Sequence, residues 1–193
     1  MRVDPSGAAS GVDPPGLDAR VLARGLAALR IFIGLIALLN GLAKVFGWHR
    51  VQLGPYLANL INRDDARFIL DFEVFKNPAN SSPGTRLPLV RSISQLMLDH
   101  WGLVGWALTV TEVVTGLLLV LGLLTRAAAL VALGQHLFLA LVYASSGRWL
   151  FEQPHEYIPL IILSIVPAGR VWGMDAWGAV RSGRGRARSG WPF

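Results

Sequence analysis

The chain has 193 residues, of which 53% are hydrophobic and 16% are charged, with a net charge of +6. A soluble domain carries charge at about a quarter of its positions, so this composition excludes an ordinary soluble globular domain. The sequence contains no cysteine, which excludes disulfides, thiolate catalysis, iron–sulfur ligation and thiolate zinc sites. The basic residues accompany no nucleic-acid-binding motif, and we therefore expect no nucleic-acid partner.

The chain opens with a polar lead and then a long apolar run. Residues 1–19 are rich in Pro, Gly, Ser and Asp, a composition that predicts a disordered cytoplasmic lead. A helix that crosses ~30 Å of hydrocarbon needs roughly 20 residues. Residues 21–46 exceed that length, although the run contains Arg30 and Lys44. No small-residue cleavage site follows, so this run predicts an uncleaved membrane span.

Three further apolar runs follow, over residues 101–124, 127–145 and 157–172. The last is the shortest, and Pro159 and Pro167 predict a first-turn proline and a later kink. Backbone groups inside hydrocarbon must bond within their own segment, so each span is expected to be a helix. The sequence therefore predicts an all-α fold, a bundle of four transmembrane helices over residues 20–177.

The segment between the first two spans, residues 47–100, is an extended loop that we expect to be partly helical. One amphipathic helix is predicted by apolar residues at helical spacing, namely Leu53, Tyr56, Leu57, Leu60 and Ile61. Asp64 and Asp65 are placed to cap a second helix, and residues 89–97 are expected to lead into the second span. We expect these helices to lie on the outer membrane surface and to dock a partner.

The distribution of arginine predicts the orientation in the membrane. Short flanking segments rich in Lys and Arg stay on the cytoplasmic side. Arginines lie before the first span, between the second and third spans, and in a basic tail at residues 178–193. With four spans, both termini are cytoplasmic. We expect a multi-pass protein of the bacterial cytoplasmic (inner) membrane.

Polar residues inside the spans fall on three helical faces. The first face has a 4-3-4-3 spacing and comprises Arg30, Gly34, Ala37, Gly41 and Lys44. The second comprises Gly105, Thr109, Glu112 and Gly116, with Glu112 near the bilayer midplane. The third comprises Ala132, His136, Leu139 and Tyr143, with Gln135 alongside. Small residues allow helices to approach closely, so these three faces are expected to meet.

Two interpretations of these polar residues stay open. Charges in hydrocarbon are costly and are usually paired or functional. Arg30, Glu112 and His136 either satisfy one another and fix the packing, or form a site for protons or charge. The candidate residues for a quinone-facing site are Arg30, Lys44, Glu112, Gln135 and His136. In either case Arg30 and Glu112 are expected to interact, directly or through His136 or water.

Haem and metal sites are disfavoured by the placement of the histidines. His136 is central in its span, whereas His100 and His155 lie at span boundaries, so a bis-histidine haem pair would be mismatched in depth. Arg148, Glu152, His155 and Glu156 could supply metal ligands, but without a further matched ligand an interfacial hydrogen-bond cluster is the better interpretation. No metal is expected, and a quinone is the one candidate cofactor.

Several short motifs, in order, resemble the DoxX family of small bacterial membrane proteins. The resemblance begins with Arg30 to Gly34, followed by Asn40-Gly41 and Lys44. It continues with Glu112, Gly116, Gly122 and the run 125–128, and ends with Gly169-Arg170, Gly173 and Asp175. The resemblance implies four transmembrane helices and an association with membrane redox systems, including thiosulfate:quinone oxidoreductases. The long first loop and the lack of cysteine depart from a catalytic thiosulfate subunit.

Three functional hypotheses follow. The first is an accessory subunit of a membrane oxidoreductase or respiratory-chain assembly, more a non-catalytic subunit than an enzyme by itself. It would contribute packing and a quinone-facing surface, with other redox subunits docked through loop 47–100. The second is a quinone-linked oxidoreductase subunit of the thiosulfate:quinone type, acting through an intramembrane Arg/Glu site. The third is a small proton-coupled transporter, which the lack of a detectable internal repeat disfavours.

Overall fold

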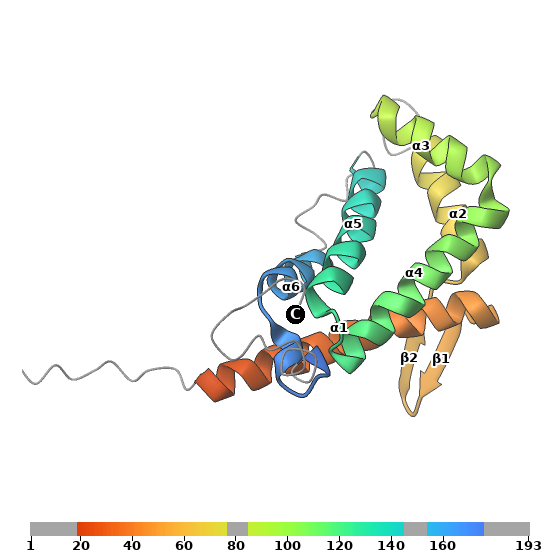
Figure 1. Ribbon diagram of the computed structural model, residues 1–193. Helices are drawn as coiled ribbons and strands as arrows, with labels where there is room; N and C mark the ends of the chain where they lie inside the picture. Colours follow the sequence, from red (N-terminus) through yellow and green to blue (C-terminus); the bar gives the residue numbers. More distant parts are fainter. Residues whose placement is uncertain (1–18, 77–84, 145–153, 176–193) are drawn as a thin grey trace, which may run out of the picture.

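The protein is represented by a computed structural model, which describes residues 19–76, 85–144 and 154–175 (Figure 1). Four helices form the body of the described chain: α1 (Ala19–Phe46), α4 (Trp101–Leu121), α5 (Thr125–Tyr143) and α6 (Pro154–Ile165). Three of them, α1, α4 and α5, are long and apolar enough to cross a membrane. The three corresponding predicted spans are therefore confirmed as helices.

The fourth predicted span differs from its prediction. Helix α6 has 12 residues and is followed by the 3-10 turn η2 (Ala168–Arg170). At 1.5 Å per residue, α6 is ~18 Å long, which is less than the ~30 Å of a hydrocarbon core. Pro159 lies inside α6, and Pro167 precedes the 3-10 turn. The fourth crossing stays a prediction, because residues 145–153 lie outside the described part of the chain.

Helices α1 and α4 pack against each other antiparallel, through glycines. A Cβ added at Gly34 would touch Val120, one at Gly116 would touch Leu38, and one at Gly41 would touch Val113. In each of these pairs the two residue numbers add up to 154. This constant sum is the register of two antiparallel helices in direct backbone contact. The small residues of the predicted faces thus set the closest approach, as expected of membrane helices.

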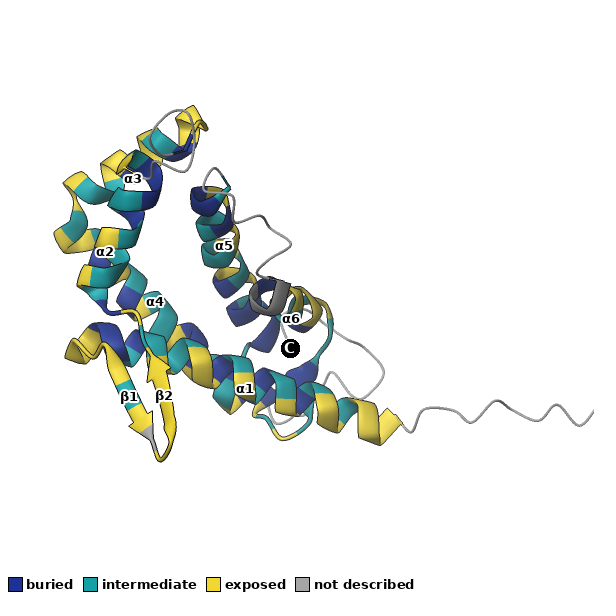
Figure 2. Cartoon of the chain, turned by 180° about the vertical axis from the view of Figure 1, so that it is seen from behind, coloured by how far each residue is buried: buried dark blue, intermediate teal, exposed yellow. Residues whose placement is uncertain are grey.

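Helices α5 and α6 complete the core, against which residues of both α1 and α4 pack. The buried core here joins Leu119 of α4 to alanines of α5 and to Leu160 and Leu163 of α6. The alanines, Ala128, Ala129 and Ala132, recur at helical spacing and leave room for the leucines of α6. Figure 2 shows the buried residues of these helices on the sides that face one another.

The first part of the long loop is a β-hairpin, so the amphipathic helix predicted over residues 53–61 is wrong. Strand β1 (Arg50–Leu53) pairs antiparallel with β2 (Tyr56–Asn59). The chain turns at Gly54, which has a φ of +60°, a value that glycine adopts without strain. Pro55 follows and cannot donate a helical hydrogen bond. The described fold is mostly helical, as the predicted all-α class requires, and the hairpin is a short addition within the loop.

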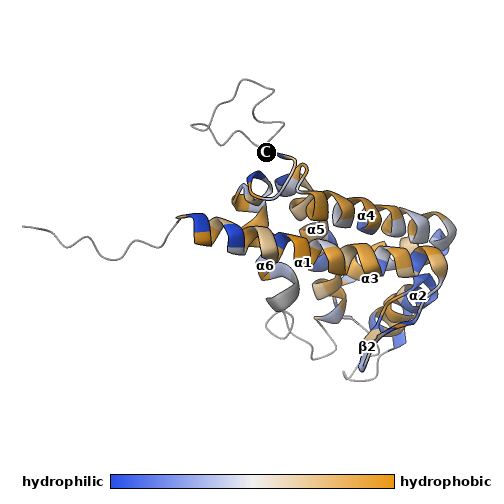
Figure 3. Cartoon of the chain, turned by 90° about the horizontal axis from the view of Figure 1, so that it is seen from below, coloured by the Kyte–Doolittle hydropathy of each residue, from blue (hydrophilic) through white to orange (hydrophobic). Residues whose placement is uncertain are grey.

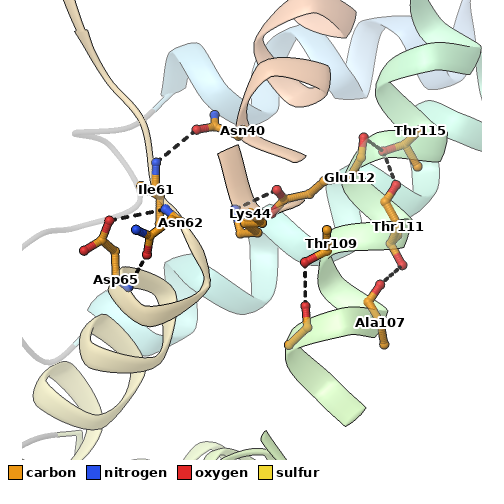
Figure 4. Close-up of polar contacts among 11 residues, drawn as sticks. Asn40, Lys44, Ile61, Asn62, Asp65, Ala107, Thr109, Thr111, Glu112 and Thr115 are labelled. Atoms are coloured by element: carbon orange, nitrogen blue, oxygen red, sulfur yellow. Dashed lines mark hydrogen bonds and ion pairs between the residues drawn. The ribbon is translucent and has the colours of Figure 1, made fainter. Parts of the chain in front are cut away.

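The second part of the loop is helical, as predicted. Helix α2 (Arg63–Asp71) runs into the π-helical turn η1 (Phe72–Lys76), and α3 (Pro88–Asp99) leads into α4. The N-cap of α2 is Asn62, whose side chain accepts from the Asp65 backbone N–H in a reciprocal capping box (Figure 4). Of the two predicted capping acids, only Asp65 takes part in this box.

These loop helices pack against the membrane helices. Leu70, Val74 and Val90 form a second buried core with Val142 of α5. Arg63 of α2 also stacks its guanidinium 4.0 Å from the ring centroid of Trp106 of α4. The expectation that the loop helices only lie on the membrane surface is therefore too simple. Part of the loop is built into the end of the helical body.

The outward faces of the long helices are apolar. Figure 3 shows hydrophobic colouring along most of α1, α4 and α5, with polar residues concentrated at the start of α1 and in the loop. Large side chains such as Phe32 and Leu103 are 61% and 75% exposed. Apolar area of this extent is stable only against lipid or another protein. The described chain is a membrane protein whose long helices contact the bilayer.

Candidate functional site

An ion pair joins the last turn of α1 to the centre of α4. Lys44 Nζ donates to Glu112 Oε2 at 2.7 Å (Figure 4). The Lys44 side chain is 5% exposed and the Glu112 side chain 24% exposed. Glu112 lies eleven residues after the start of α4 and nine before its end, so it is near the centre of this helix. Each charge therefore has its partner in a place where an unpaired charge would be costly.

The expected interaction between Arg30 and Glu112 is wrong, and the helix register explains why. Because opposed residues of α1 and α4 add up to 154, Arg30 lies opposite residue 124, beyond the end of α4. That position is twelve residues, or ~18 Å along the helix axis, from Glu112. Lys44 lies opposite residue 110, only two residues from Glu112, so its long side chain reaches the carboxylate.

Arg30 is instead buried at the other end of the contact between α1 and α4, where it lies among backbone carbonyls. Its Nη1 donates to the Ala168 carbonyl at 3.2 Å and its Nη2 to the Trp172 carbonyl at 2.8 Å. The guanidinium also lies in the attractive field of Asp175. Arg30 thereby ties α1 to the segment that follows α6. Its side chain does not line the cavity described below.

Asp175, fully buried, closes the start of α5. Its carboxylate accepts from the Leu124 N–H at 2.7 Å, the Thr125 N–H at 3.2 Å and the Thr125 hydroxyl at 2.8 Å. Leu124 has a φ of +49°, a left-handed conformation that costs a leucine roughly 1–2 kcal/mol. Asp175 thus acts as the N-cap that α5 lacks locally and holds the tight turn between α4 and α5.

A cavity of about 420 Å³ lies between the long helices and the loop helices. Its walls are mainly apolar, but polar side chains from three helices reach it. These are Asn40, Lys44, Glu112, Thr115, Gln135, His136 and Tyr143. Four of the five residues predicted to face a quinone therefore line one cavity, and Arg30 is the exception. Pockets for small organic ligands have this size and this mixture of groups.

Helix α5 contributes a histidine that bonds to its own helix. His136 Nδ1 lies 2.8 Å from the Ala132 carbonyl oxygen. A carbonyl only accepts, so His136 Nδ1 is the donor in this contact. Gln135, next to it, has no hydrogen-bond partner among the described residues, and its amide offers both a donor and an acceptor.

The threonine hydroxyls of α4 are less available to a ligand than the number of threonines suggests. Thr109 and Thr115 each donate their hydroxyl to a carbonyl one turn earlier in the helix, at 2.7 Å (Figure 4). Such bonds satisfy a hydroxyl inside a membrane helix without a second helix. The hydroxyl of Thr115 is therefore already engaged, and the other polar side chains that line the cavity are Asn40, Lys44, Glu112, Gln135, His136 and Tyr143.

Sequence reasoning missed the part of the cavity that the loop supplies. On the side where α2 and α3 pack, the wall of the cavity is formed by Ile61, Ile69, Leu70 and Met97. Asn40 of α1 holds this side in place, because its Oδ1 accepts from the Ile61 N–H at 3.4 Å. The only available signal was the motif Asn40-Gly41, in which a polar residue interrupts an apolar span.

Metal and haem ligands are not assembled in the described part of the chain. No group of three or more His, Asp or Glu side chains that could hold a metal occurs there. His100 lies at the junction of α3 and α4, where its Nδ1 contacts the Leu96 carbonyl at 3.1 Å, and it does not line the cavity. The predicted cluster of Arg148, Glu152, His155 and Glu156 lies outside the residues whose side chains are described.

The fold and the site define a small helical membrane protein with an ion-paired cavity among its helices. The DoxX family model matches residues 25–145, which is more than half of the chain. The chain therefore belongs to the DoxX family, as the sequence motifs predicted. Neither a curated protein nor a solved structure matches the chain.

Proposed function

We propose that this protein is an accessory subunit of a membrane-bound oxidoreductase or respiratory assembly, and that its cavity binds the head group of a quinone. One observation carries the proposal: Lys44, Glu112, Gln135 and His136 converge on a single apolar cavity between membrane helices. A quinone combines an apolar ring and tail with two oxygens at opposite ring positions. Apolar walls with a few convergent polar groups suit that chemistry.

An accessory role is favoured over an independent enzyme. Quinone chemistry needs a source or acceptor of electrons, and we assign that task to a partner subunit. The alternative of a thiosulfate:quinone subunit acting through an Arg/Glu pair loses its support, because Arg30 is ~18 Å from Glu112 along the helix axis. The lack of cysteine also removes thiolate sulfur chemistry from this chain.

A proton-coupled transporter is the remaining alternative, and the ion pair counts against it. A coupling carboxylate must be free to exchange its partners during transport, whereas Glu112 is engaged by Lys44 at 2.7 Å. The same pair suits a binding site, because the Lys44 ammonium is a donor and the Glu112 carboxylate an acceptor at defined positions in the cavity wall.

We propose the bacterial cytoplasmic membrane as the location, with both termini in the cytoplasm. The arginine-rich flanks support this orientation. Arg126 also lies at the start of α5, the same end at which Arg30 is buried. Reporter fusions at Phe193 and near residue 80 test the orientation. A reporter at Phe193 that is active only in the periplasm would overturn it.

We propose that other redox subunits dock on the outward side of loop 47–100. Helix α3 supports this, because Leu89 and Leu96 lie two turns apart on one face and are 71% and 61% exposed. Exposed apolar patches of this kind mark interaction surfaces. The double variant Leu89→Ser/Leu96→Ser is expected to lose the partner on purification in mild detergent, as seen by mass spectrometry and a visible spectrum.

A matched control separates docking from lipid contact. Leu103 of α4 is 75% exposed, so Leu103→Ser removes a similar apolar area from a membrane helix. This control is expected to keep the partner. If both variants retain it at full yield, loop docking is wrong.

The quinone site is tested by binding to the full chain in detergent. A short-chain ubiquinone analogue, decylubiquinone, is added in oxidised and in reduced form, and bound ligand is measured after equilibrium dialysis. Gln135→Leu removes one hydrogen-bonding group from the cavity and is expected to weaken binding by about tenfold, or ~1.4 kcal/mol. The control Thr111→Val changes a hydroxyl of α4 outside the cavity, whose bond goes to the Ala107 carbonyl. If neither form binds to the unaltered chain, the proposed function is wrong.

A further inference from the structure

The cavity is closed at both of its ends by buried side chains. Toward the α4–α5 turn, its wall consists of Leu119, Ala132 and Leu160, which belong to the buried core of α4, α5 and α6. At the other end, Leu70 and Met97 line the cavity within the core that joins the loop helices to α5. These two cores separate the cavity from the water on either side of the membrane.

The exposed part of the cavity wall lies at the side, along α1. Among the described residues that line the cavity, Ile36 and Ile61 are exposed, at 44% and 38%, whereas the others are buried or partly buried. Asn40 lies one turn after Ile36, and its Oδ1 accepts from the Ile61 N–H at 3.4 Å. The three residues are therefore neighbours, and together they define what we call the side opening.

The side opening lies at the depth of the lipid chains. Ile36 is ten residues before Phe46, the last residue of α1. At 1.5 Å per residue this is ~15 Å, about half of the ~30 Å of a hydrocarbon core. Leu35 and Leu39, on the same stretch of α1, are also exposed, and Figure 3 shows hydrophobic colouring along most of this helix. The lipid-facing surface of α1 thus continues into the cavity at Ile36.

The ion pair of the cavity lies nearer to the loop than the side opening does. By the register of α1 and α4, Glu112 lies opposite residue 42 of α1. This level is six residues, or ~9 Å, closer to the end of α1 than Ile36. A ligand with its polar group at Lys44 and Glu112 would therefore extend its chain toward Ile36. A phospholipid of the leaflet on the loop side has the same orientation, with its chains toward the centre of the bilayer.

We infer that the ligand of this cavity enters from the bilayer and keeps an apolar chain in the side opening, while its head group lies at the level of Lys44 and Glu112. The inference rests on the proposed function and deepens it, because it makes the chain of the quinone a recognised part of the ligand. An apolar chain in contact with Ile36 leaves water or detergent for an apolar wall, which stabilises the complex.

The test compares two quinones on the full chain in detergent, with bound ligand measured after equilibrium dialysis. One is decylubiquinone, and the other is dimethoxymethylbenzoquinone, the same head group without the decyl chain. Ile36→Trp fills the side opening and is expected to raise the dissociation constant of decylubiquinone about tenfold. The constant of the chainless quinone is expected to stay unchanged, because its head group does not reach Ile36.

The matched control is the neighbouring position on α1. Leu35 is 43% exposed and does not line the cavity, so Leu35→Trp adds the same side chain to the lipid-facing surface alone. This variant is expected to keep both dissociation constants. Because each ligand is compared across variants, its partition into the detergent micelle cancels.

A second measurement uses the lack of cysteine in the chain. Ile36→Cys carries a single nitroxide label in vesicles of phosphatidylethanolamine and phosphatidylglycerol. We expect the label to be more accessible to oxygen, which concentrates in lipid, than to a water-soluble nickel chelate. Decylubiquinone is expected to reduce the mobility of this label and to leave that of a label on Leu35→Cys unchanged.

The outcomes separate the inference from the proposed function. If Ile36→Trp weakens both quinones equally, or neither, the chain does not lie in the side opening, and the quinone site remains. A label at position 36 that meets mainly the nickel chelate shows an opening to water and overturns entry from the bilayer. Binding of neither quinone to the unaltered chain overturns the proposed function and this inference with it. Size-exclusion elution identifies an Ile36→Trp variant that has not folded, and the label on Ile36→Cys then decides.

Discussion

Lys44 and Glu112 are joined by a 2.7 Å ion pair between helices that meet through glycine contacts. The antiparallel register of α1 and α4 determines this partnership, and it places Arg30 beyond reach of the carboxylate. The pair thus serves two purposes, because it neutralises a lysine that is 5% exposed and it places both groups at the wall of the cavity.

The first prediction concerns the energy of this pair. Glu112→Gln leaves the Lys44 ammonium without its counter-charge, and breaking such a pair costs about 3–5 kcal/mol. We expect a lower midpoint of thermal unfolding in detergent. Adding Lys44→Met removes the orphaned charge and is expected to recover part of the loss. Adding Arg30→Gln instead should lower stability further, since Arg30 has separate partners. Recovery by Arg30→Gln and not by Lys44→Met would contradict the assigned pairing.

The second prediction concerns the capping of α5 by Asp175. Asp175→Ala removes three hydrogen bonds to Leu124 and Thr125 and leaves the buried Arg30 without a nearby negative charge. We expect a loss of about 2–4 kcal/mol, because the cap of α5 is lost and buried N–H groups of Leu124 and Thr125 are left without a partner. The measurement is thermal unfolding of the detergent-solubilised chain.

A control for Asp175→Ala is available on the loop. Asp71 pairs with Lys76 at the surface, where the two side chains are 34% and 64% exposed. Exposed pairs contribute at most about 1 kcal/mol, so Asp71→Ala is expected to leave the unfolding midpoint nearly unchanged. Equal effects of the two substitutions would argue against Asp175 as the cap.

The third prediction compares two glycines that sequence alone does not distinguish. Gly122 has a φ of +64°, and a Cβ there would collide with the Arg30 guanidinium and approach Gly173. Gly134 lies within α5, and a Cβ there would meet no atom within 4 Å. Gly122→Ala is therefore expected to destabilise the protein by more than about 1 kcal/mol, whereas Gly134→Ala gains up to ~1 kcal/mol of helix propensity. Relative to the unaltered chain, the unfolding midpoint is expected to fall in Gly122→Ala and to rise in Gly134→Ala.

The sequence predicted the helices and their polar faces because both depend on local periodicity. The spacing from Arg30 to Lys44 identified one face of α1 correctly, and Gly34 and Gly41 do contact α4. The partner of each charge was not predictable in the same way. It depends on where the two helices overlap, and the α4–α5 turn, held by Asp175 from ~50 residues further along the chain, helps to set that overlap.

In the loop, the prediction from helical periodicity failed for a different reason. The apolar residues from Leu53 to Ile61 fit a helical period, but Gly54 and Pro55 make a turn, and the strands on either side pair. The chemistry of these two residues was a stronger signal than the period. The contribution of Ile69 and Leu70 to the cavity could not be predicted, because it depends on contacts between segments far apart in the sequence.

The last prediction separates the hairpin from the cavity-forming part of the loop. The hairpin carries exposed side chains, with Tyr56 at 79% and Leu57 at 56%, and none of residues 50–59 lines the cavity. The residues that flank it are already adjacent, since the Leu60 N–H donates to the His49 carbonyl at 2.9 Å. A short Gly-Gly link can therefore replace residues 50–59 without moving α1 or α2.

We expect this replacement to leave the unfolding midpoint and the affinity for decylubiquinol unchanged. The matched comparison is Leu70→Ala, which opens the buried core beside the cavity and is expected to cost about 2–5 kcal/mol and to weaken binding. If the hairpin replacement abolishes ligand binding while the chain stays folded, then the hairpin supports the site from outside. Loss of a co-purifying partner with binding intact would instead place part of the docking surface on the hairpin, where Tyr56 and Leu57 are exposed.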